Sequence, residues 1–409
     1  MDACGSAFDA LIVGAGPAGS SLAIQLARAG WSVALVERQP FPRRKVCGEC
    51  IAASNLPWLQ ALGIGEALQR LAGPPLRQVT LMRGERAVTA DLPAADDLRF
   101  PWGRALGRET LDGLLLAQAR LAGAVIFQPW AVRAIGGTAA AWRCELQSRE
   151  TAAVLQLRAT LLIDAHGSWE ALPTERPRRR LARGRSELLA FKANFSGTSL
   201  PAGTIAVLAL DGGYGGMVVA DGGTSTLACC IRRDRLGGLR RAAPGVRAGE
   251  AVQAWLQREC AGVRQALDGA VRDGHWLSAG PLAPGVRVAA RDGIFRIGNA
   301  AGEAHPLLGE GMSMALQSAA LLGAQLLAAT PGAPVPGADM QAALHRRYAA
   351  DWRREFVPRL RLAAVFAQLA MRPAGAAVLT TLAQAWPGLL THGARWGGKL
   401  RFAAPAGSR

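Results

Sequence analysis

The chain opens with a change in hydrophobic periodicity. Residues 8–13 form a short apolar run rich in β-favouring residues, and residues 20–29 carry apolar side chains at helical spacing up to Gly30. A second apolar run, residues 31–36, ends at Glu37. Strand, turn, helix and strand within about thirty residues predict a βαβ unit.

The same alternation returns later in the chain. A helical pattern around 114–119, preceded by the segment 104–112, is followed by a short strand-like run at 125–127. Two further apolar runs, 159–164 and 293–298, each end in a turn, and a long helical pattern starts at Met312. Strands that alternate with helices predict a parallel sheet and an α/β fold.

The turn after the first strand has the spacing of a dinucleotide site. Gly14 permits a tight turn, Gly16 lets the backbone approach a pyrophosphate, and Gly19 lets the helix pack closely on the strand. The helix N-terminus offers free N–H groups and a partial positive charge to phosphates. Glu37 follows the second strand, where a carboxylate accepts hydrogen bonds from a ribose. We therefore expect a bound dinucleotide.

Composition and charge narrow the class of protein. The 409 residues are half apolar, with a formal charge of +17 that comes almost entirely from arginine. The densest basic run, 176–185, has no interleaved aromatic residues, so nucleic-acid binding is disfavoured. A solvated face, or one that attracts an anionic coenzyme or a lipid surface, is the better interpretation.

Targeting and cysteine patterns add little. The N-terminus lacks the pattern of a signal peptide, and the seven cysteines show no paired framework. The apolar stretches 314–329 and 363–391 are interrupted by polar residues and proline, so neither is expected to span a membrane. We expect a cytoplasmic protein that is soluble or, at most, lies on a membrane surface. No metal site is expected from the scattered histidines.

Six segments together resemble one flavoprotein superfamily. They are the first glycine turn with Glu37, and the segments 44–49, 108–112, 164–167, 212–216 and 298–311. In this order they resemble FAD-dependent oxidoreductases of the p-hydroxybenzoate hydroxylase fold, in the branch of flavoprotein monooxygenases and geranylgeranyl-reductase-like enzymes. The resemblance implies an α/β fold with a Rossmann-like FAD-binding domain, a mixed β-sheet substrate domain and C-terminal helices.

The implied domain organisation is discontinuous. The FAD-binding domain would comprise 1–75, 101–175 and 284–330, and the substrate domain would comprise the strands in 76–100 and the segment 176–283. Residues 331–409 would form a helical segment that covers one end of the substrate cavity or lies on an anionic bilayer.

The resemblance also implies which residues hold FAD. Asn299 departs from the family, which usually has Asp there, but its amide oxygen can still accept a hydrogen bond from a ribityl hydroxyl. No second glycine fingerprint is present, so NAD(P)H is expected to bind transiently as the electron donor. The implied FAD contacts are Gly14, Gly16, Ala18, Gly19, Glu37, Arg38, Cys47, Arg108, Asp164, Gly167, Gly298, Asn299, Pro306, Gly309, Gly311 and Met312.

Four residues are candidates for chemistry beside the flavin. His305 and Glu310 bracket the start of the long helix and either move a proton or cap the helix. Tyr214 follows a double glycine and either lines the pocket or packs in the turn. Cys47 either lines the pocket or belongs to a plain loop, and a redox pair with Cys50 is disfavoured.

Three reactions fit this resemblance. The preferred one is NAD(P)H-dependent oxygenation by O₂ of an aromatic, polyketide-like or other lipophilic metabolite. The runner-up is reduction of an isoprenoid or similar C=C bond by a geranylgeranyl-reductase-like enzyme. Flavin-dependent halogenation comes third, since it needs a lysine and the three lysines are poorly placed; a non-enzymatic flavin-binding protein is also open.

Overall fold

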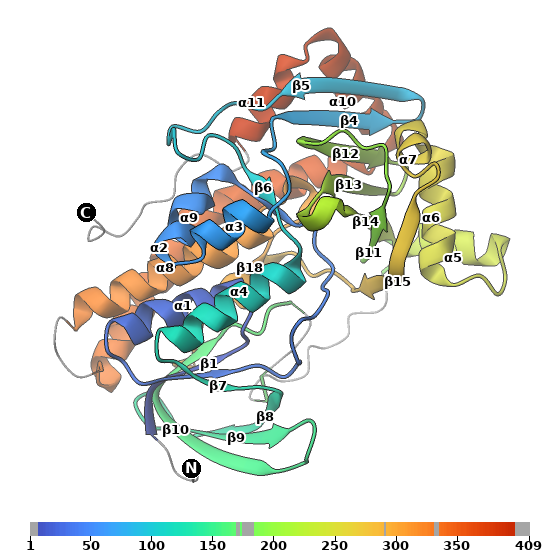
Figure 1. Cartoon of the computed structure of the whole chain (residues 1–409). Helices are drawn as coiled ribbons and strands as arrows, with labels where there is room; N and C mark the ends of the chain where they lie inside the picture. The colour runs from blue at the N-terminus through green and yellow to red at the C-terminus, as the bar shows by residue number, and fades with distance from the viewer. Residues whose placement is uncertain (1–6, 169–171, 174–183, 290–291, 331–334, 397–409) are drawn as a thin grey trace.

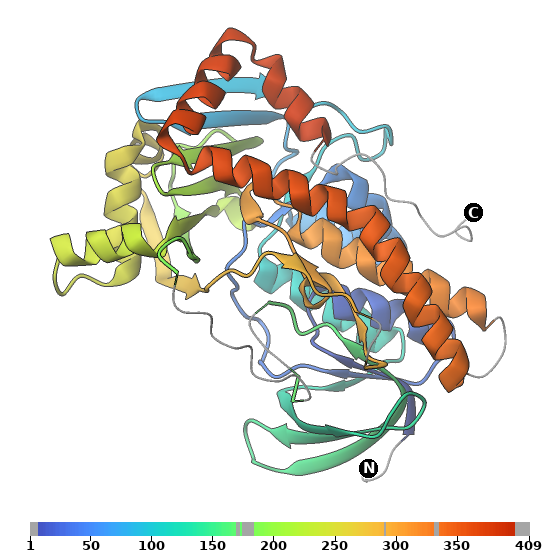
Figure 2. The same ribbon diagram turned by 180° about the vertical axis from the view of Figure 1, so that it is seen from behind.

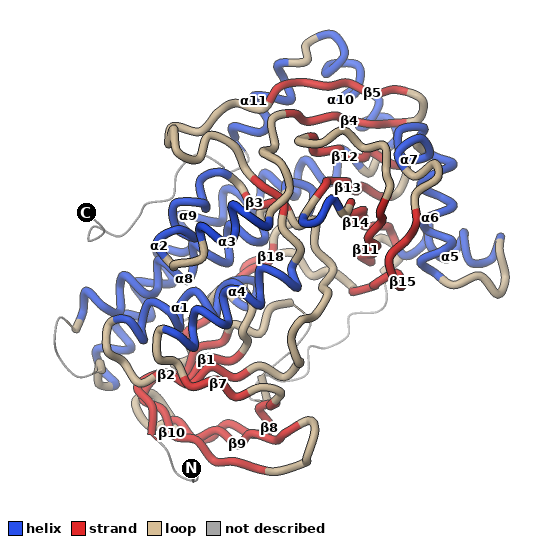
Figure 3. Tube along the Cα trace, viewed as in Figure 1, coloured by secondary structure: helices blue, strands red, loops and turns tan. Residues whose placement is uncertain are grey.

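The computed structural model describes residues 7–168, 172–173, 184–289, 292–330 and 335–396. Two seven-stranded sheets lie at opposite ends of the molecule, and helices run between and around them (Figure 1; Figure 3). Part of the basic run predicted at 176–185, and Lys399, lie outside the described residues.

The first sheet is built on the predicted βαβ unit. β1, β2, β7, β10 and β17 pair in parallel, while β9 and β8 extend the sheet as antiparallel strands. In spatial order the strands are β7 (Val125–Phe127), β2 (Val33–Val36), β1 (Ala7–Val13), β10 (Val154–Asp164), β9 (Trp142–Ser148) and β8 (Trp130–Gly136), with β17 (Phe295–Arg296) beside β10.

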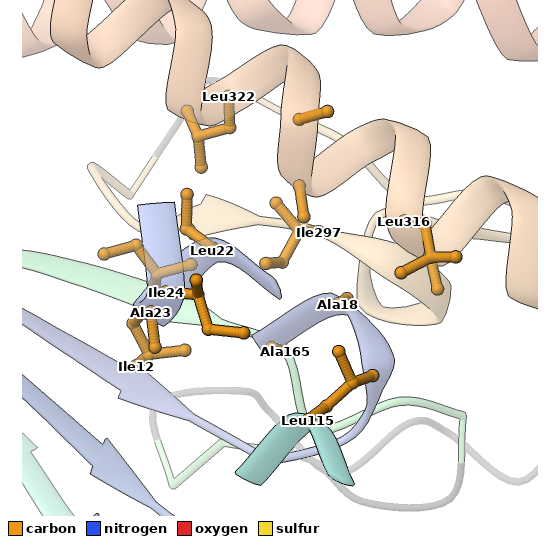
Figure 4. Close-up of a cluster of buried hydrophobic side chains, with 14 of the residues drawn as sticks. Ile12, Ala18, Leu22, Ala23, Ile24, Leu115, Ala165, Ile297, Leu316 and Leu322 are labelled. Carbon is orange, nitrogen blue, oxygen red and sulfur yellow. The ribbon is translucent and has the colours of Figure 1, made fainter. Parts of the chain in front are cut away.

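Both faces of the parallel strands are buried, which explains why they are continuously apolar. Ile12 and Leu35 face the main core, whereas Leu11 and Ala34 face a second cluster under the β8–β9 hairpin. Helices α1 (Pro17–Arg28), α4 (Arg108–Leu121) and α8 (Gly311–Ala329) cover the first of these faces. Figure 4 shows side chains from α1, α4 and α8 meeting over this sheet.

The second sheet is mixed. β4 pairs in parallel with β12, and every other neighbouring pair is antiparallel. Its order is β15 (Val271–Ala279), β11 (Leu188–Ser196), β14 (Ser225–Arg232), β13 (Gly213–Val219), β12 (Thr204–Leu210), β4 (Gln78–Arg83) and β5 (Arg86–Asp91). Strands from two distant parts of the chain therefore complete one sheet.

Helices flank the second sheet on both faces. α5 (Arg233–Ala242), α6 (Ala248–Glu259) and α7 (Ala261–Ala266) cover one face, around the buried Trp255. α9 (Ala338–Ala370) crosses the molecule from the first sheet to the second, and α10 (Pro373–Ala385) and α11 (Gly388–Trp396) continue along the second (Figure 2).

Short elements connect the two regions. α2 (Leu56–Ala61) and α3 (Gly65–Leu71) pack near α1, and two small ribbons pair β3 (Cys50–Ile51) with β6 (Arg104–Ala105) and β16 (Gly285–Val286) with β18 (Gly302–Glu303). Single 3₁₀ turns occupy Ala53–Asn55, Asp221–Gly223, Gly298–Ala300 and Pro306–Leu308.

One local expectation was wrong. The segment 108–112 does not precede a helix but forms the first turns of α4, where Arg108 and Asp112 pair one turn apart. α8 is long and apolar enough to cross a membrane by length and composition, although 67% of its apolar window is buried inside the protein. Its apolarity is explained by packing between α1 and α9.

Candidate active site

A cavity of about 1560 Å³ collects most of the predicted FAD contacts. Its walls come from the first sheet, the second sheet and the C-terminal helices. Gly19 and Asp164 do not line it. The predicted residues that do are Gly14, Gly16, Ala18, Glu37, Arg38, Cys47, Arg108, Gly167, Gly298, Asn299, Pro306, Gly309, Gly311 and Met312.

The first glycine turn leaves room for a ligand and none for side chains behind it. Gly14 has φ +107°, and a Cβ there would lie 2.5 Å from the carbonyl oxygen of Ala165. A Cβ on Gly19 would lie 1.9 Å from the carbonyl oxygen of Gly14, which explains the glycine although it does not line the cavity. A Cβ on Gly16 would meet only the Arg108 guanidinium, at 3.7 Å.

The N-terminus of α1 faces this opening without a cap. Gly16 is the N-cap and makes no side-chain hydrogen bond, Pro17 stands at the first helical position, and no acidic residue lies in the first turn. The first N–H groups and the positive end of the helix dipole are therefore available to a phosphate.

Glu37 is held rigidly at the carboxyl end of β2. Its carboxylate accepts hydrogen bonds from the backbone N–H groups of Ala15, at 3.0 Å, and Gln39, at 2.8 Å. The side chain is buried and lines the cavity. This geometry fits a carboxylate that accepts hydroxyl groups of a ribose.

Cationic side chains surround the same end of the cavity. Arg108 binds Asp112 through two hydrogen bonds of 2.8 Å, and Arg43 lies 3.6 Å from the same carboxylate. Burial opposes the charge of Arg108, but Asp112 outweighs it and raises the pKa of the guanidinium. Burial, with Arg108 and Arg43 nearby, lowers the pKa of Lys45 to about 8.

Asp164 shapes a turn rather than the cavity wall. It is fully buried, and its carboxylate accepts a hydrogen bond from the backbone N–H of His166 at 3.2 Å. The same oxygen contacts the His166 ring. The next residues, 165–168, line the cavity, and the Asn299 amide donates to the hydroxyl of Ser168 at 2.8 Å. The amide oxygen of Asn299 is the group left to accept from a ligand.

The start of α8 provides a second uncapped helix N-terminus. Gly309 adopts a left-handed conformation, with φ +67°, and the N-cap residue Glu310 makes no side-chain cap hydrogen bond. A Cβ on Gly309 or Gly311 would meet no protein atom within 4 Å. Two helix N-termini thus face one glycine-lined cavity, and this arrangement fits an extended dinucleotide.

Of the four predicted catalytic residues, the structure places Tyr214 and Cys47 at the cavity. Tyr214 is almost fully buried on β13, beside Cys230 of β14, and burial raises the pKa of its phenol well above the ordinary value. Cys47 and Cys50 are not joined by a disulfide bond. The Cys47 sulfur accepts a hydrogen bond from the N–H of Glu49, and the Cys50 thiol donates to Gly48, each at 3.4 Å.

His305 and Glu310 do not line the cavity. Burial lowers the pKa of His305, and Glu303 partly offsets this effect. Glu310 is buried 3.9 Å from Arg359 of α9. Their neighbour Glu303 lines the cavity instead and accepts a hydrogen bond from Arg287 at 2.8 Å.

Sequence reasoning missed a buried polar cluster at the junction of the two sheets. Glu49 has φ +60° and lines the cavity; its carboxylate accepts from the Arg108 N–H at 2.9 Å. It also binds the ammonium of Lys192 on β11 and the hydroxyl of Thr226 on β14. The signals in the sequence were Glu49 at the end of the segment 44–49 and a lone lysine in an apolar strand.

The apolar wall of the cavity was also not identified residue by residue. Leu362 and Phe366 of α9, Leu379 and Leu382 of α10, and Leu389 and Leu390 of α11 line it opposite the second sheet. The C-terminal helices therefore cover one end of the cavity. Over the described ranges, no group of His, Cys, Asp or Glu could hold a metal ion.

This geometry fits a protein that binds FAD across the starts of α1 and α8. The chain belongs to the family described as the FAD binding domain, whose match covers residues 7–351. The α/β fold, with its FAD-binding domain, mixed sheets and C-terminal helices, is thereby confirmed.

Curated relatives cover the chain unevenly. Tryptophan 2-halogenase of Chondromyces crocatus is 26% identical over 76% of this chain and 59% of its own length. Menaquinone reductase of Mycobacterium tuberculosis is 35% identical over 28% of each chain. The chain thus matches less than two thirds of the length of either relative.

Solved structures agree over most of the chain. The myxobacterial chondrochloren halogenase CndH has a TM-score of 0.75 at 20% identity and covers 97% of this chain and 100% of its own. PqsL of P. aeruginosa has a TM-score of 0.67 at 19% identity, covering 89% and 96%. A geranylgeranyl bacteriochlorophyll reductase-like protein of Thermoplasma acidophilum has a TM-score of 0.69 at 16% identity, covering 90% and 88%. At these identities the likeness extends to the fold alone.

Proposed function

We propose that this chain is a FAD-dependent, NAD(P)H-reduced monooxygenase that hydroxylates an aromatic, polyketide-like or other lipophilic metabolite. The observation that carries the proposal is the continuity of one cavity from the glycine turn of α1 into a chamber with apolar walls. A substrate in that chamber would lie in the same cavity as the coenzyme.

The chamber selects for lipophilic molecules. Leu81, Ile205 and Val207 of the second sheet line it, opposite Phe366 and Leu379 of the C-terminal helices. Such a wall binds apolar surface and keeps water from the reacting atoms.

FAD, when bound, supplies redox chemistry at its isoalloxazine, including the activation of O₂ after reduction. The residues of this chain provide orientation and charge. The uncapped start of α8 offers N–H groups and a positive partial charge to the electron-rich edge of the flavin. Tyr214, like any phenol, is protonated at neutral pH and can donate a hydrogen bond inside the cavity; burial raises its pKa further.

The positions of the lysines bear on halogenation, which the relatives also suggest. Lys45 lies at the end of the cavity that contains Arg108 and Gly167. Lys192 is 1% exposed, is paired with Glu49 and does not line the cavity. Neither described lysine faces the apolar chamber, and this favours oxygenation over halogenation.

Double-bond reduction remains the second candidate because Cys47 lines the cavity. The loop that carries Cys47 is the segment by which the sequence resembles geranylgeranyl-reductase-like proteins.

Isotope labelling separates the three reactions. The FAD-loaded protein is incubated with NADPH, ¹⁸O₂, bromide and a panel of lipophilic phenols and polyenes, and the products are analysed by mass spectrometry. The proposal predicts products that gain one ¹⁸O atom and no turnover without O₂. Reduced products formed under anaerobiosis, or brominated products, contradict it.

A filled chamber provides the matched variant. Val207→Trp should raise KM at least tenfold while FAD content is unchanged, because the new side chain occupies the substrate half only. Val154→Trp is the control, because this side chain is 54% exposed on β10, away from the chamber. It should change neither KM nor FAD content.

A further inference from the structure

Exposed apolar side chains gather where the C-terminal helices turn. Val365 and Leu369 of α9, Val378 of α10, and Trp386 between α10 and α11 are 56%, 40%, 57% and 58% exposed. These helices form a corner at the outer edge of the second sheet, beyond β4 and β5 (Figure 1; Figure 2). We call Val365, Leu369, Val378, Leu382 and Trp386 the apolar corner.

The sequence after Glu355 carries charge of one sign. No Asp or Glu follows Glu355 in the sequence, whereas seven basic residues do: Arg359, Arg361, Arg372, Arg395, Lys399, Arg401 and Arg409. Of these, Arg361 and Arg372 are exposed on α9 and at the α9–α10 break. Apolar side chains next to exposed cations such as Arg361 and Arg372 match the interface of an anionic bilayer.

The cavity reaches the surface at the same corner. Leu382 lines the cavity and is also 51% exposed, and the exposed residues His392 and Gly393 line it as well. A lipophilic molecule that leaves a bilayer under this corner would enter the chamber without crossing water.

The bend between α9 and α10 favours docking over crossing. Together the two helices are long and apolar enough for one span, but they meet at 101°. A corner of this shape presents its tip to an interface, and its flanks carry arginines that remain at the headgroup level.

We propose that the apolar corner docks on an anionic lipid bilayer and that the cavity takes its substrate from that bilayer. The docking is independent of the reaction; only the delivery of substrate rests on the proposed function. Self-association through the same face is disfavoured, because two copies would bring the exposed Arg361 and Arg372 of each together.

Vesicle co-sedimentation tests the docking. FAD-loaded full-length protein is mixed with vesicles of phosphatidylcholine alone, or of phosphatidylcholine with one third phosphatidylglycerol. We expect at least tenfold stronger partitioning to the anionic vesicles and a loss of that difference in high salt. Equal partitioning to both, or to neither, overturns the proposal.

Variants assign the binding to the corner. The triple change Val365→Ser, Val378→Ser and Trp386→Ser should reduce partitioning at least tenfold, and so should Arg361→Glu with Arg372→Glu. Val154→Ser with Val271→Ser removes two side chains that are 54% and 66% exposed on other elements, and should leave partitioning unchanged. FAD content verifies that each variant is folded. Unchanged vesicle binding in the triple variant contradicts the proposal. So does a wild-type protein that binds no vesicles but forms a dimer that the triple change dissociates.

The two proposals fail separately. Vesicle binding needs neither NADPH nor turnover, so docking without oxygenation removes the proposed function alone. Oxygenation that proceeds equally fast from vesicles in wild type and triple variant removes the delivery claim alone.

Discussion

The two halves of the cavity recognise their ligands by different means. The coenzyme half presents backbone at the Gly14–Gly16 turn and at the starts of α1 and α8, together with charged side chains such as Glu37 and Arg108. The chamber half is made of apolar side chains from the second sheet and from α9–α11. Backbone recognition requires glycine at fixed places, whereas an apolar wall requires only volume and shape. The coenzyme half should therefore tolerate far less change than the chamber.

The most severe test of this contrast is Gly14→Val. Its Cβ would lie 2.5 Å from the Ala165 carbonyl oxygen at a φ of +107°, so the turn must move. We expect the purified protein to lose its FAD, measured as absorbance near 450 nm. Gly113→Ala is the control, because a Cβ there meets no protein atom within 4 Å. A yellow Gly14→Val protein would contradict the role of this turn.

The junction between the two halves, where Glu49 binds Lys192, should be nearly as sensitive to substitution. Lys192→Met removes the cation that binds the buried Glu49 carboxylate. Breaking a buried ion pair in this way typically destabilises a protein by about 3–5 kcal/mol. Urea unfolding of the FAD-loaded protein measures it. Adding Glu49→Gln should restore part of the loss, because no uncompensated charge then remains. If the double variant is as unstable as the sum of the two single changes, the pair is not coupled.

The contrast also explains which parts of the site could be predicted from the sequence. Gly14, Gly16 and Glu37 leave a local signature, because a backbone site needs particular residues at particular spacings within one βαβ unit. The close packing that requires Gly19 could be predicted in the same way, whereas Asp164 supports its turn without reaching the cavity, and this was harder to predict. The start of α4 was misplaced because Gly107 is fixed by Asp221, which lies far away in the sequence.

The chamber and the junction lack such signatures. Phe366 and Leu379 look like ordinary core residues of amphipathic helices, and only the tertiary fold sets them opposite Val207. Glu49 and Lys192 are 143 residues apart and meet because β11 packs against the loop after Cys47. His305 and Glu310 were predicted from their place beside α8, but neither lines the cavity.

A smaller effect is expected at the ribose end. Glu37→Ala removes the acceptor of the Ala15 and Gln39 N–H groups, and we expect FAD binding to weaken by about 1–3 kcal/mol. Fluorescence titration of the apoprotein with FAD measures the change. Glu66→Ala, on the exposed start of α3, should leave the affinity unchanged. Equal affinities for the two variants would count against the assignment.

The smallest effect concerns pH. The pKa of Lys45 is lowered to about 8, so its charge is present below pH 8 and is lost above it. Phosphate oxygens favour the charged form, so binding above pH 8 requires proton uptake. FAD affinity should fall by up to about tenfold per pH unit there. Lys45→Arg should abolish this fall between pH 7.5 and 9.5, whereas a slope identical to that of wild type would rule out Lys45.

The central claim is that one cavity binds FAD between the first sheet and the part of the second sheet that carries Tyr214. Titration of the purified apoprotein with FAD, followed by absorbance and tyrosine-sensitive fluorescence in wild type and Tyr214→Phe, tests it directly. The account predicts one FAD per chain, a shifted flavin band, and a band that changes in the Tyr214→Phe protein. The account would be contradicted if the protein did not bind FAD, or if the flavin spectrum were the same in wild type and Tyr214→Phe.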